Sequence, residues 1–179
     1  RLLIVIYDTY TNLGMYENTE QFLEDNKSFE KSFNDYYFLG RSYSIASEIN
    51  RWKGNLQQAE DDMCEAIANF EAGEQYFQLV SILNRLVCFY LDAGDIKNAI
   101  KTLRKSERIA EKNEETSQIL RINLIKILIQ AGEGKTDLDT LKNFENDIAN
   151  DISTATNSQS LYENWWFLSE CFRLLGDTK

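Results

Sequence analysis

The sequence of 179 residues contains no proline and only eight glycines. Proline and glycine provide most of the chain reversals in loop-rich folds, and proline also breaks helices. Their scarcity therefore argues against a loop-rich β fold and favours long helices joined by tight turns. We expect an all-α protein.

Histidine is absent, which removes both the commonest general base and the commonest zinc ligand. The three cysteines, Cys64, Cys88 and Cys171, are far apart and form no C-x-x-C pair, so they predict reduced thiols rather than a metal or disulfide framework. Carboxylate-only or cysteine–lysine chemistry stays formally open, but no spacing frames such a site. We predict no catalytic residue, no metal, no cofactor and no enzymatic activity, in a cytoplasmic protein.

Long apolar runs are also missing, and none approaches the roughly 20 residues that a membrane span needs. The formal charge is −10 with a pI of about 4.6, which argues against nucleic acid and anionic membranes as partners. Hydrophobic residues nevertheless make up 43% of the chain, enough for a well-ordered core.

Four of the few glycines, Gly14, Gly54, Gly94 and Gly134, are each 40 residues apart, and Gly176 follows the last by 42. A large apolar residue recurs eleven and eight positions before the glycine, a small or apolar residue seven before, and usually an aromatic or aliphatic residue four before. The fourth copy is the least regular, and there Leu124, Ile125 and Leu128 take the expected offsets from Gly132. Such offsets place them on one stripe of a helix. The third and fifth copies are the clearest. They read Leu83, Leu86, Val87, Tyr90 and Trp165, Leu168, Ser169, Phe172.

The glycine provides the left-handed conformation for a reversal, and Ala59 or Ala99, five residues later, allows the next helix to pack closely. At the second copy Asn50 stands where the others have an aromatic or aliphatic residue. At the fourth, Gly132 is an alternative to Gly134 as the end of the first helix, and two glycines predict a looser turn. Gly134-Lys135-Thr136 resembles the end of a phosphate-binding loop, but the preceding pattern is helical and a structural turn is predicted.

These repeats predict about nine helices in antiparallel pairs within one repeat domain, residues 1–179. The expected repeats are about 1–35, 36–74, 75–115 and 116–158, with a partial copy at 159–179. The chain also has no initiator methionine, and it stops where another helix would begin. We therefore expect a fragment of a longer protein, with other domains of that chain among its partners.

This pattern resembles the tetratricopeptide repeat family over nearly the whole chain. The 40-residue period departs from the usual 34 and is similar to the long variant of kinesin light chains, maltose-regulator-type activators and Gram-positive peptide-pheromone receptors. The family's frequent proline after the second helix is absent. The resemblance implies an α-α superhelix, a solenoid whose first helices line a concave groove that binds a protein or peptide.

The residues of the groove face are found by counting positions along each first helix from its apolar stripe. We expect Trp52, Asn84 and Arg51 to carry most of the ligand contact, and Asn84, Arg41 and Arg51 match the family's use of Asn and Arg on this face. Glu48 and Asp92 stand where anion-binding residues would be, which disfavours a carboxylate-terminated acidic ligand. The complete set of candidate site residues is Arg41, Glu48, Arg51, Trp52, Asn84, Cys88, Lys126, Trp166 and Arg173.

The sequence therefore predicts a non-catalytic scaffold or signalling module that binds a partner peptide or helix. The alternative is a ligand-sensing regulatory arm of a larger bacterial signalling or transcription-regulatory protein.

Overall fold

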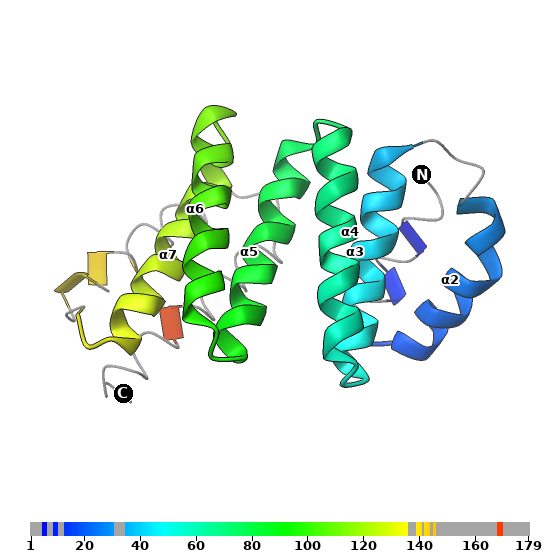
Figure 1. The fold of residues 1–179 in the computed structure, drawn as a ribbon, viewed down its shortest axis with the longest axis horizontal. Helices are drawn as coiled ribbons and strands as arrows, with labels where there is room; N and C mark the ends of the chain where they lie inside the picture. The colour runs from blue at the N-terminus through cyan, green and yellow to red at the C-terminus, as the bar shows by residue number, and fades with distance from the viewer. Residues whose placement is uncertain are drawn as a thin grey trace. The chain divides into compact units, whose positions relative to one another are not determined.

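The computed structural model describes residues 5–6, 9–10, 13–30, 35–135, 139–140, 142–143, 145 and 168–169. The chain forms two compact units, Arg1–Glu115 and Thr116–Lys179, and each is described by itself. Six helices have defined bounds (Figure 1). They are α2 (Tyr16–Glu30), α3 (Tyr36–Trp52), α4 (Leu56–Ala72), α5 (Tyr76–Asp92), α6 (Ile96–Lys112) and α7 (Thr116–Gly132). No strand occurs among the described residues, so the all-α prediction is confirmed.

The helices follow one another at a constant interval. Their first residues are 16, 36, 56, 76, 96 and 116, and α3 to α7 each contain 17 residues. The 40-residue repeat of the sequence is therefore two helices and two three-residue turns. None of the described helices combines the length and the hydropathy that crossing a bilayer requires.

The turns share one hydrogen-bond pattern, the Schellman motif. After α3, the amide of Gly54 donates to the carbonyl of Arg51 (3.1 Å) and the amide of Asn55 to that of Asn50 (2.8 Å). Gly14, Gly54, Gly94 and Gly134 all have positive φ, between 68° and 79°, as the sequence predicted. Lys135 closes the turn after α7 in the same way as Asn55 after α3, so the prediction of a looser turn is wrong. Gly132 is the last residue of α7, and Gly134 has the positive φ of the turn.

The turns that follow α4 and α6 use glutamate in place of glycine. Glu74 and Glu114 have φ of 53° and 57°, a left-handed conformation that L-residues rarely adopt. The first bond of each turn is correspondingly longer, 3.3 Å from Glu74 and 3.4 Å from Glu114. The expected repeats end at about residues 74 and 115, next to these turns, but the left-handed glutamates themselves were not predicted.

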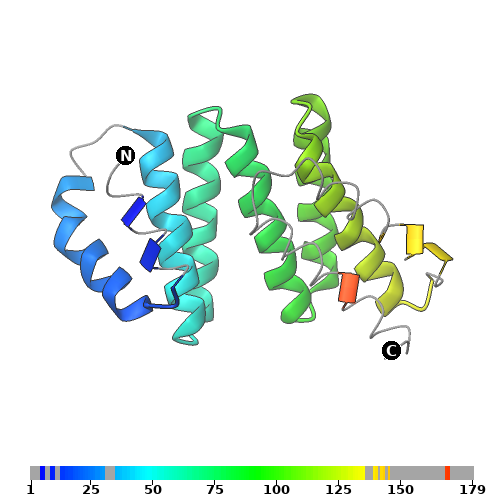
Figure 2. The ribbon, with the colours of Figure 1, turned by 180° about the vertical axis from the view of Figure 1, so that it is seen from behind.

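The first unit is built from two closely packed helix pairs, α3 with α4 and α5 with α6, and α4 also packs against α5 (Figures 1 and 2). The main core lies between α4 and α5 and so joins the second and third predicted repeats. It contains Ala59, Met63, Ala66, Phe70, Leu79, Ile82, Leu83, Leu86 and Phe89. Helix α2 packs against α3 around Phe38, Ile45 and Ile49.

Small residues mark the closest helix contacts. Ala59 and Ala99 are fully buried, as expected from their positions after the turns. Gly40 of α3 lies against the ring of Phe70 in α4, and an ideal Cβ on Gly40 would be 2.5 Å from Phe70 Cε1. Only glycine fits there without a shift of the ring.

Asn50, the exception in the apolar pattern, has a structural explanation. Its side-chain amide donates to Asp62 Oδ2 of α4 at 2.8 Å, and Gln58 donates to the other oxygen at 3.1 Å. Asp62 is 7% exposed, and a buried carboxylate needs such donors. Asn50 therefore links the two helices of its pair by a polar contact.

Candidate peptide-binding surface

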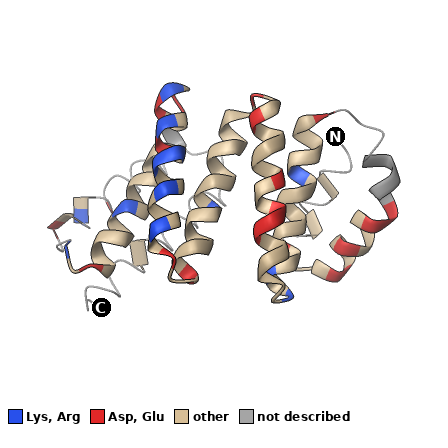
Figure 3. Cartoon of the chain, in the orientation of Figure 1, with Lys and Arg blue, Asp and Glu red and all other residues tan. Residues whose placement is uncertain are grey.

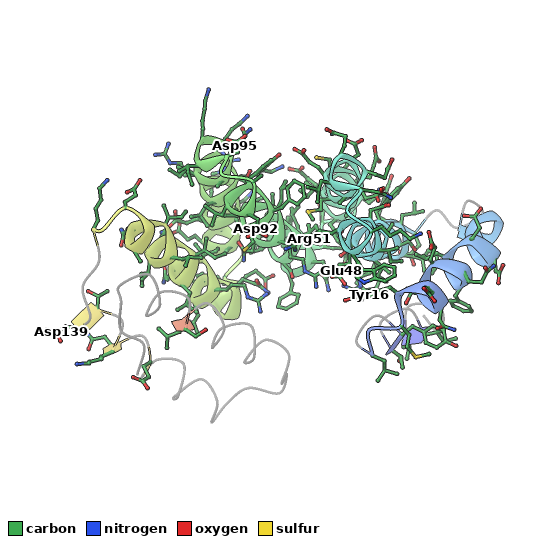
Figure 4. All side chains as sticks on the ribbon, turned by 90° about the horizontal axis from the view of Figure 1, so that it is seen from below. Tyr16, Glu48, Arg51, Asp92, Asp95 and Asp139 are labelled. Carbon is green, nitrogen blue, oxygen red and sulfur yellow. The ribbon has the colours of Figure 1, made fainter. Side chains whose placement is uncertain are left out.

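The first helices of two successive pairs, α3 and α5, share a polar surface that we call the α3–α5 seam. Arg85 of α5 donates to the carboxylate of Glu48 and to Ser44 Oγ (3.4 Å) on α3. Arg51 Nη2 donates to Asp92 Oδ2 at 2.9 Å, and Figure 4 shows these two residues side by side. The seam consists of Arg41, Ser44, Glu48, Arg51, Ser81, Arg85 and Asp92.

The seam's ion pairs differ in exposure. The side chains of Arg51 and Asp92 are 46% and 63% exposed, so this pair contributes at most about 1 kcal/mol to folding. Those of Arg85 and Glu48 are 30% and 31% exposed and better shielded from solvent. Because both carboxylates are paired with arginines, the reason for disfavouring an acidic ligand here no longer holds.

A cavity of about 80 Å³ opens at one part of the seam. Arg41, Ser44, Ser81 and Arg85 supply its polar lining, and Phe77, 43% exposed, is one of its apolar residues. The volume holds several water molecules. The remaining lining residues are Tyr37, Phe70, Gln78 and Ile82.

The predicted site residues do not all lie on this surface. Arg41, Glu48 and Arg51 belong to the seam. Trp52 is 53% exposed at the end of α3 and stacks on Tyr16 of α2, with ring centroids 5.3 Å apart. Cys88 is half-buried on α5.

Asn84 is not an exposed groove residue. It is 2% exposed, and its Oδ1 accepts a hydrogen bond from Ser106 Oγ of α6 at 2.7 Å. The count from the apolar stripe placed Asn84 on the polar face, but a hydroxyl of α6 satisfies its side chain inside the helix pair. Lys126 is half-buried on α7 of the second unit, and Trp166 and Arg173 lie outside the described residues.

Two structural features of the candidate surface were not predicted from the sequence. Arg85 contacts residues 37 and 41 positions earlier, and Arg51 contacts a residue 41 positions later. Opposite charges spaced by about one repeat were therefore the signal for this seam. The second feature is a pocket of about 350 Å³ between α2, α3 and α4, whose walls combine apolar and acidic side chains. It is lined by Glu20, Leu23, Glu24, Leu39, Ser42, Tyr43, Ala46, Ile49, Asn50, Gln58 and Asp62.

Other motifs of the sequence have structural explanations. Gly134 and Lys135 form the turn after α7, and a helix rather than a strand precedes them. Within the described residues, no three His, Cys, Asp or Glu side chains lie together as metal ligands would.

Comparisons with known proteins add no identification: no protein-family model, curated protein or solved structure matches this chain.

Proposed function

We propose that this chain is a non-catalytic, tetratricopeptide-like module, a solenoid of stacked helix pairs, that binds a partner peptide or helix along the α3–α5 seam. The observation that carries the proposal is the pair of contacts Glu48–Arg85 and Arg51–Asp92, which link equivalent faces of successive first helices. Together with the constant 20-residue interval between helix starts, they support a stack in which first helices form one continuous surface.

The chemistry of the seam fits the backbone of a peptide. Arg51 and Arg85 each have five N–H donors and use only some of them on Asp92, Glu48 and Ser44. Ser81, which is half-buried, adds a hydroxyl, and Phe77 adds an exposed ring beside the cavity, whereas Ser44 is 4% exposed and accepts from Arg85. A polar surface with one apolar anchor is typical of peptide-binding sites.

The thiol of Cys64 supports the non-catalytic part of the proposal. Partial burial raises its pKa, and the neighbouring carboxylates of Glu60, Asp61 and Glu65 raise it further. Nucleophilic cysteines have lowered pKa values, because the thiolate is the reactive form. Cys64 is therefore a poor nucleophile at neutral pH.

The test uses peptides that are selected from a random library for binding to the wild-type chain. Calorimetric titration then measures the Kd of such a peptide for the wild type and for the variants. Arg51→Gln/Asp92→Asn removes the exposed ion pair of the seam without changing net charge, and both side chains are exposed enough to leave the fold intact. We expect Kd to rise at least about tenfold, equivalent to about 1.4 kcal/mol.

The matched control is Lys135→Gln/Glu133→Gln, which removes an exposed ion pair outside the seam and also conserves net charge. It should change Kd by less than about twofold, well under 0.5 kcal/mol. Equal affinity of the wild type and the seam variant would reject the seam as the binding site.

The regulatory-arm alternative has one observation in its favour, the pocket of about 350 Å³ beside α2. Its volume lies within the usual range of small-molecule sites. Ala46 is part of the lining, so Ala46→Phe should fill the pocket and abolish any ligand-induced rise in melting temperature. A small-molecule library that stabilises the wild type and this variant equally would remove the support for this alternative.

A further inference from the structure

Helix α6 carries a strongly basic surface in an acidic chain. Its 17 residues contain six Lys or Arg and two Glu, a net charge of +4, whereas the whole chain has −10. The six cations recur every three or four residues and therefore share one face (Figure 3). We call them the α6 basic stripe: Lys97, Lys101, Arg104, Lys105, Arg108 and Lys112.

The basic stripe is not a requirement of the repeat. The equivalent positions of α4, 40 residues earlier, hold no cation. They are Gln57, Asp61, Cys64, Glu65, Ala68 and Ala72. Helix α4 packs in its pair and is as long as α6, so the fold tolerates neutral or acidic residues there.

Most of these cations form no ion pair with the described residues. Lys105 is paired with Glu71 of α4 at 3.0 Å. Lys97, Lys101, Arg104 and Arg108 are exposed, and no carboxylate of the described residues lies within 4.0 Å of their charged groups. Like charges at spacings of three and four destabilise a helix slightly, so the stripe costs some stability.

The stripe lies opposite the packing face of α6. Ala99, Leu103, Ser106 and Ala110 are buried, and Ser106 contacts Asn84 of α5. Lys101 is two residues from Ala99 and two residues from Leu103, and two residues correspond to a rotation of about 200° around the helix, so Lys101 lies on the face opposite these buried residues. The stripe thus faces away from α5 and is open to a partner.

An apolar side chain lies within the stripe. Ile100 is half-buried between the cations, and Ile96, at the start of the helix, is 43% exposed. The stripe spans 16 residues from Lys97 to Lys112, and the 15 steps between them correspond to about 22 Å along the helix axis. Its neighbouring cations are about 6 Å apart along the helix axis, a spacing of one helical turn.

We propose that the α6 basic stripe is a second docking surface, which binds an acidic segment of a partner protein through carboxylates about one turn apart and an apolar residue against Ile100. It is separate from the α3–α5 seam and does not depend on peptide binding there. Charge complementarity would speed encounter and select acidic partners, and the apolar contact would add affinity.

Nucleic acid is a weaker match for this surface. Nucleic-acid-binding domains are usually basic as a whole, whereas this chain has a pI of about 4.6. A polyanion broader than the stripe would also meet the acidic α4, which carries five acidic and no basic residues and reaches Lys105 through Glu71 (Figure 3). A short acidic protein segment avoids that repulsion.

The test uses a fluorescein-labelled helical peptide of about 18 residues, with Glu in every turn of one face and Leu beside it. Fluorescence anisotropy compares the wild type with Lys101→Gln/Arg104→Gln/Arg108→Gln. The control, Gln57→Glu/Ala68→Glu/Ala72→Glu, changes net charge by the same amount at the equivalent face of α4, where all three positions are exposed. Circular dichroism verifies that both variants are folded.

We expect peptide affinity to fall at least about tenfold in the α6 variant and less than about threefold in the control. Affinity should also fall steeply with added salt in the wild type, a measurement that needs no variant. Any one of four results would overturn the proposal: no peptide binding, salt-independent binding, equal loss in both variants, or tighter binding of an oligothymidylate of equal charge. Salt-sensitive self-association that the α6 variant abolishes would assign the stripe to a second copy instead.

Discussion

Replacing Gly40 by alanine tests the close packing of α3 on α4. Alanine favours a helix over glycine by about 1 kcal/mol, so at an open position the change would stabilise the protein. Here the new Cβ would be 2.5 Å from Phe70 Cε1, whereas carbon atoms in contact are normally about 3.5–4.0 Å apart. The ring must therefore move by roughly 1 Å.

The surroundings of Phe70 leave little room for that movement. The residue is 1% exposed within the main core, and the ring centroid of Tyr37 is 6.5 Å from its own. Overpacking of this kind costs about 1–3 kcal/mol, which outweighs the gain in helix propensity. We expect a net loss of about 1 kcal/mol and a melting temperature about 4 °C lower by circular dichroism.

Two further variants make this test specific. Gly132→Ala at the end of α7 has no atom within 4 Å of the new Cβ, so it should be neutral or slightly stabilising. Phe70→Leu combined with Gly40→Ala should be less destabilising than the sum of the single changes by at least about 0.5 kcal/mol. If Gly40→Ala were as stable as the wild type, the packing described for α3 and α4 would be incorrect.

Three other predictions concern a turn, a thiol and a helix cap. Glu114→Gly should raise the free energy of unfolding by about 1 kcal/mol, because glycine adopts positive φ without strain; an unchanged urea midpoint would contradict the turn geometry. The rate at which iodoacetamide modifies Cys64, followed by peptide mass spectrometry, should rise with pH with a midpoint above the usual thiol pKa of about 8.5. Asp61→Asn should lower that midpoint, and a wild-type midpoint below the usual value would contradict the local electrostatics. The carboxylate of Asp95 accepts hydrogen bonds from the backbone amide of Asn98 (3.0 Å) and from the side-chain amide of Asn98 (2.7 Å), and these bonds lower the pKa of Asp95. The stabilisation by this cap is therefore complete above the unfolded-state pKa of about 3.9 and is lost as pH falls through the folded-state pKa. The stability difference between wild type and Asp95→Asn should thus shrink in urea titrations below about pH 4, and a difference independent of pH would refute this assignment.

The sequence predicted the helices well because their signals are local. Glycines 40 residues apart mark alternate turns, and apolar stripes such as Leu83, Leu86 and Val87 identify the buried faces. The repeat ends near residues 74 and 115 were predicted, but the left-handed conformation of Glu74 and Glu114 was not, since glutamate has no intrinsic preference for positive φ.

The candidate site was less predictable because it depends on contacts between repeats. A helical count places Arg51 and Asn84 on similar polar faces, yet one is exposed and the other is buried against Ser106. The net charge of the chain also concealed the α6 basic stripe, since a total of −10 averages over acidic helices such as α4. Comparing equivalent positions of successive repeats would have revealed both features.

Mapping of a bound peptide by nuclear magnetic resonance tests the central claim most directly. A library-selected peptide is titrated into the isotope-labelled chain, and changes in amide and arginine side-chain signals are assigned to residues. We predict that the largest changes cluster on the seam, at Arg41, Ser44, Arg51, Ser81 and Arg85. Changes confined to the outer faces of α4 and α6, with the seam signals unmoved, would contradict the proposal that the α3–α5 seam binds the partner.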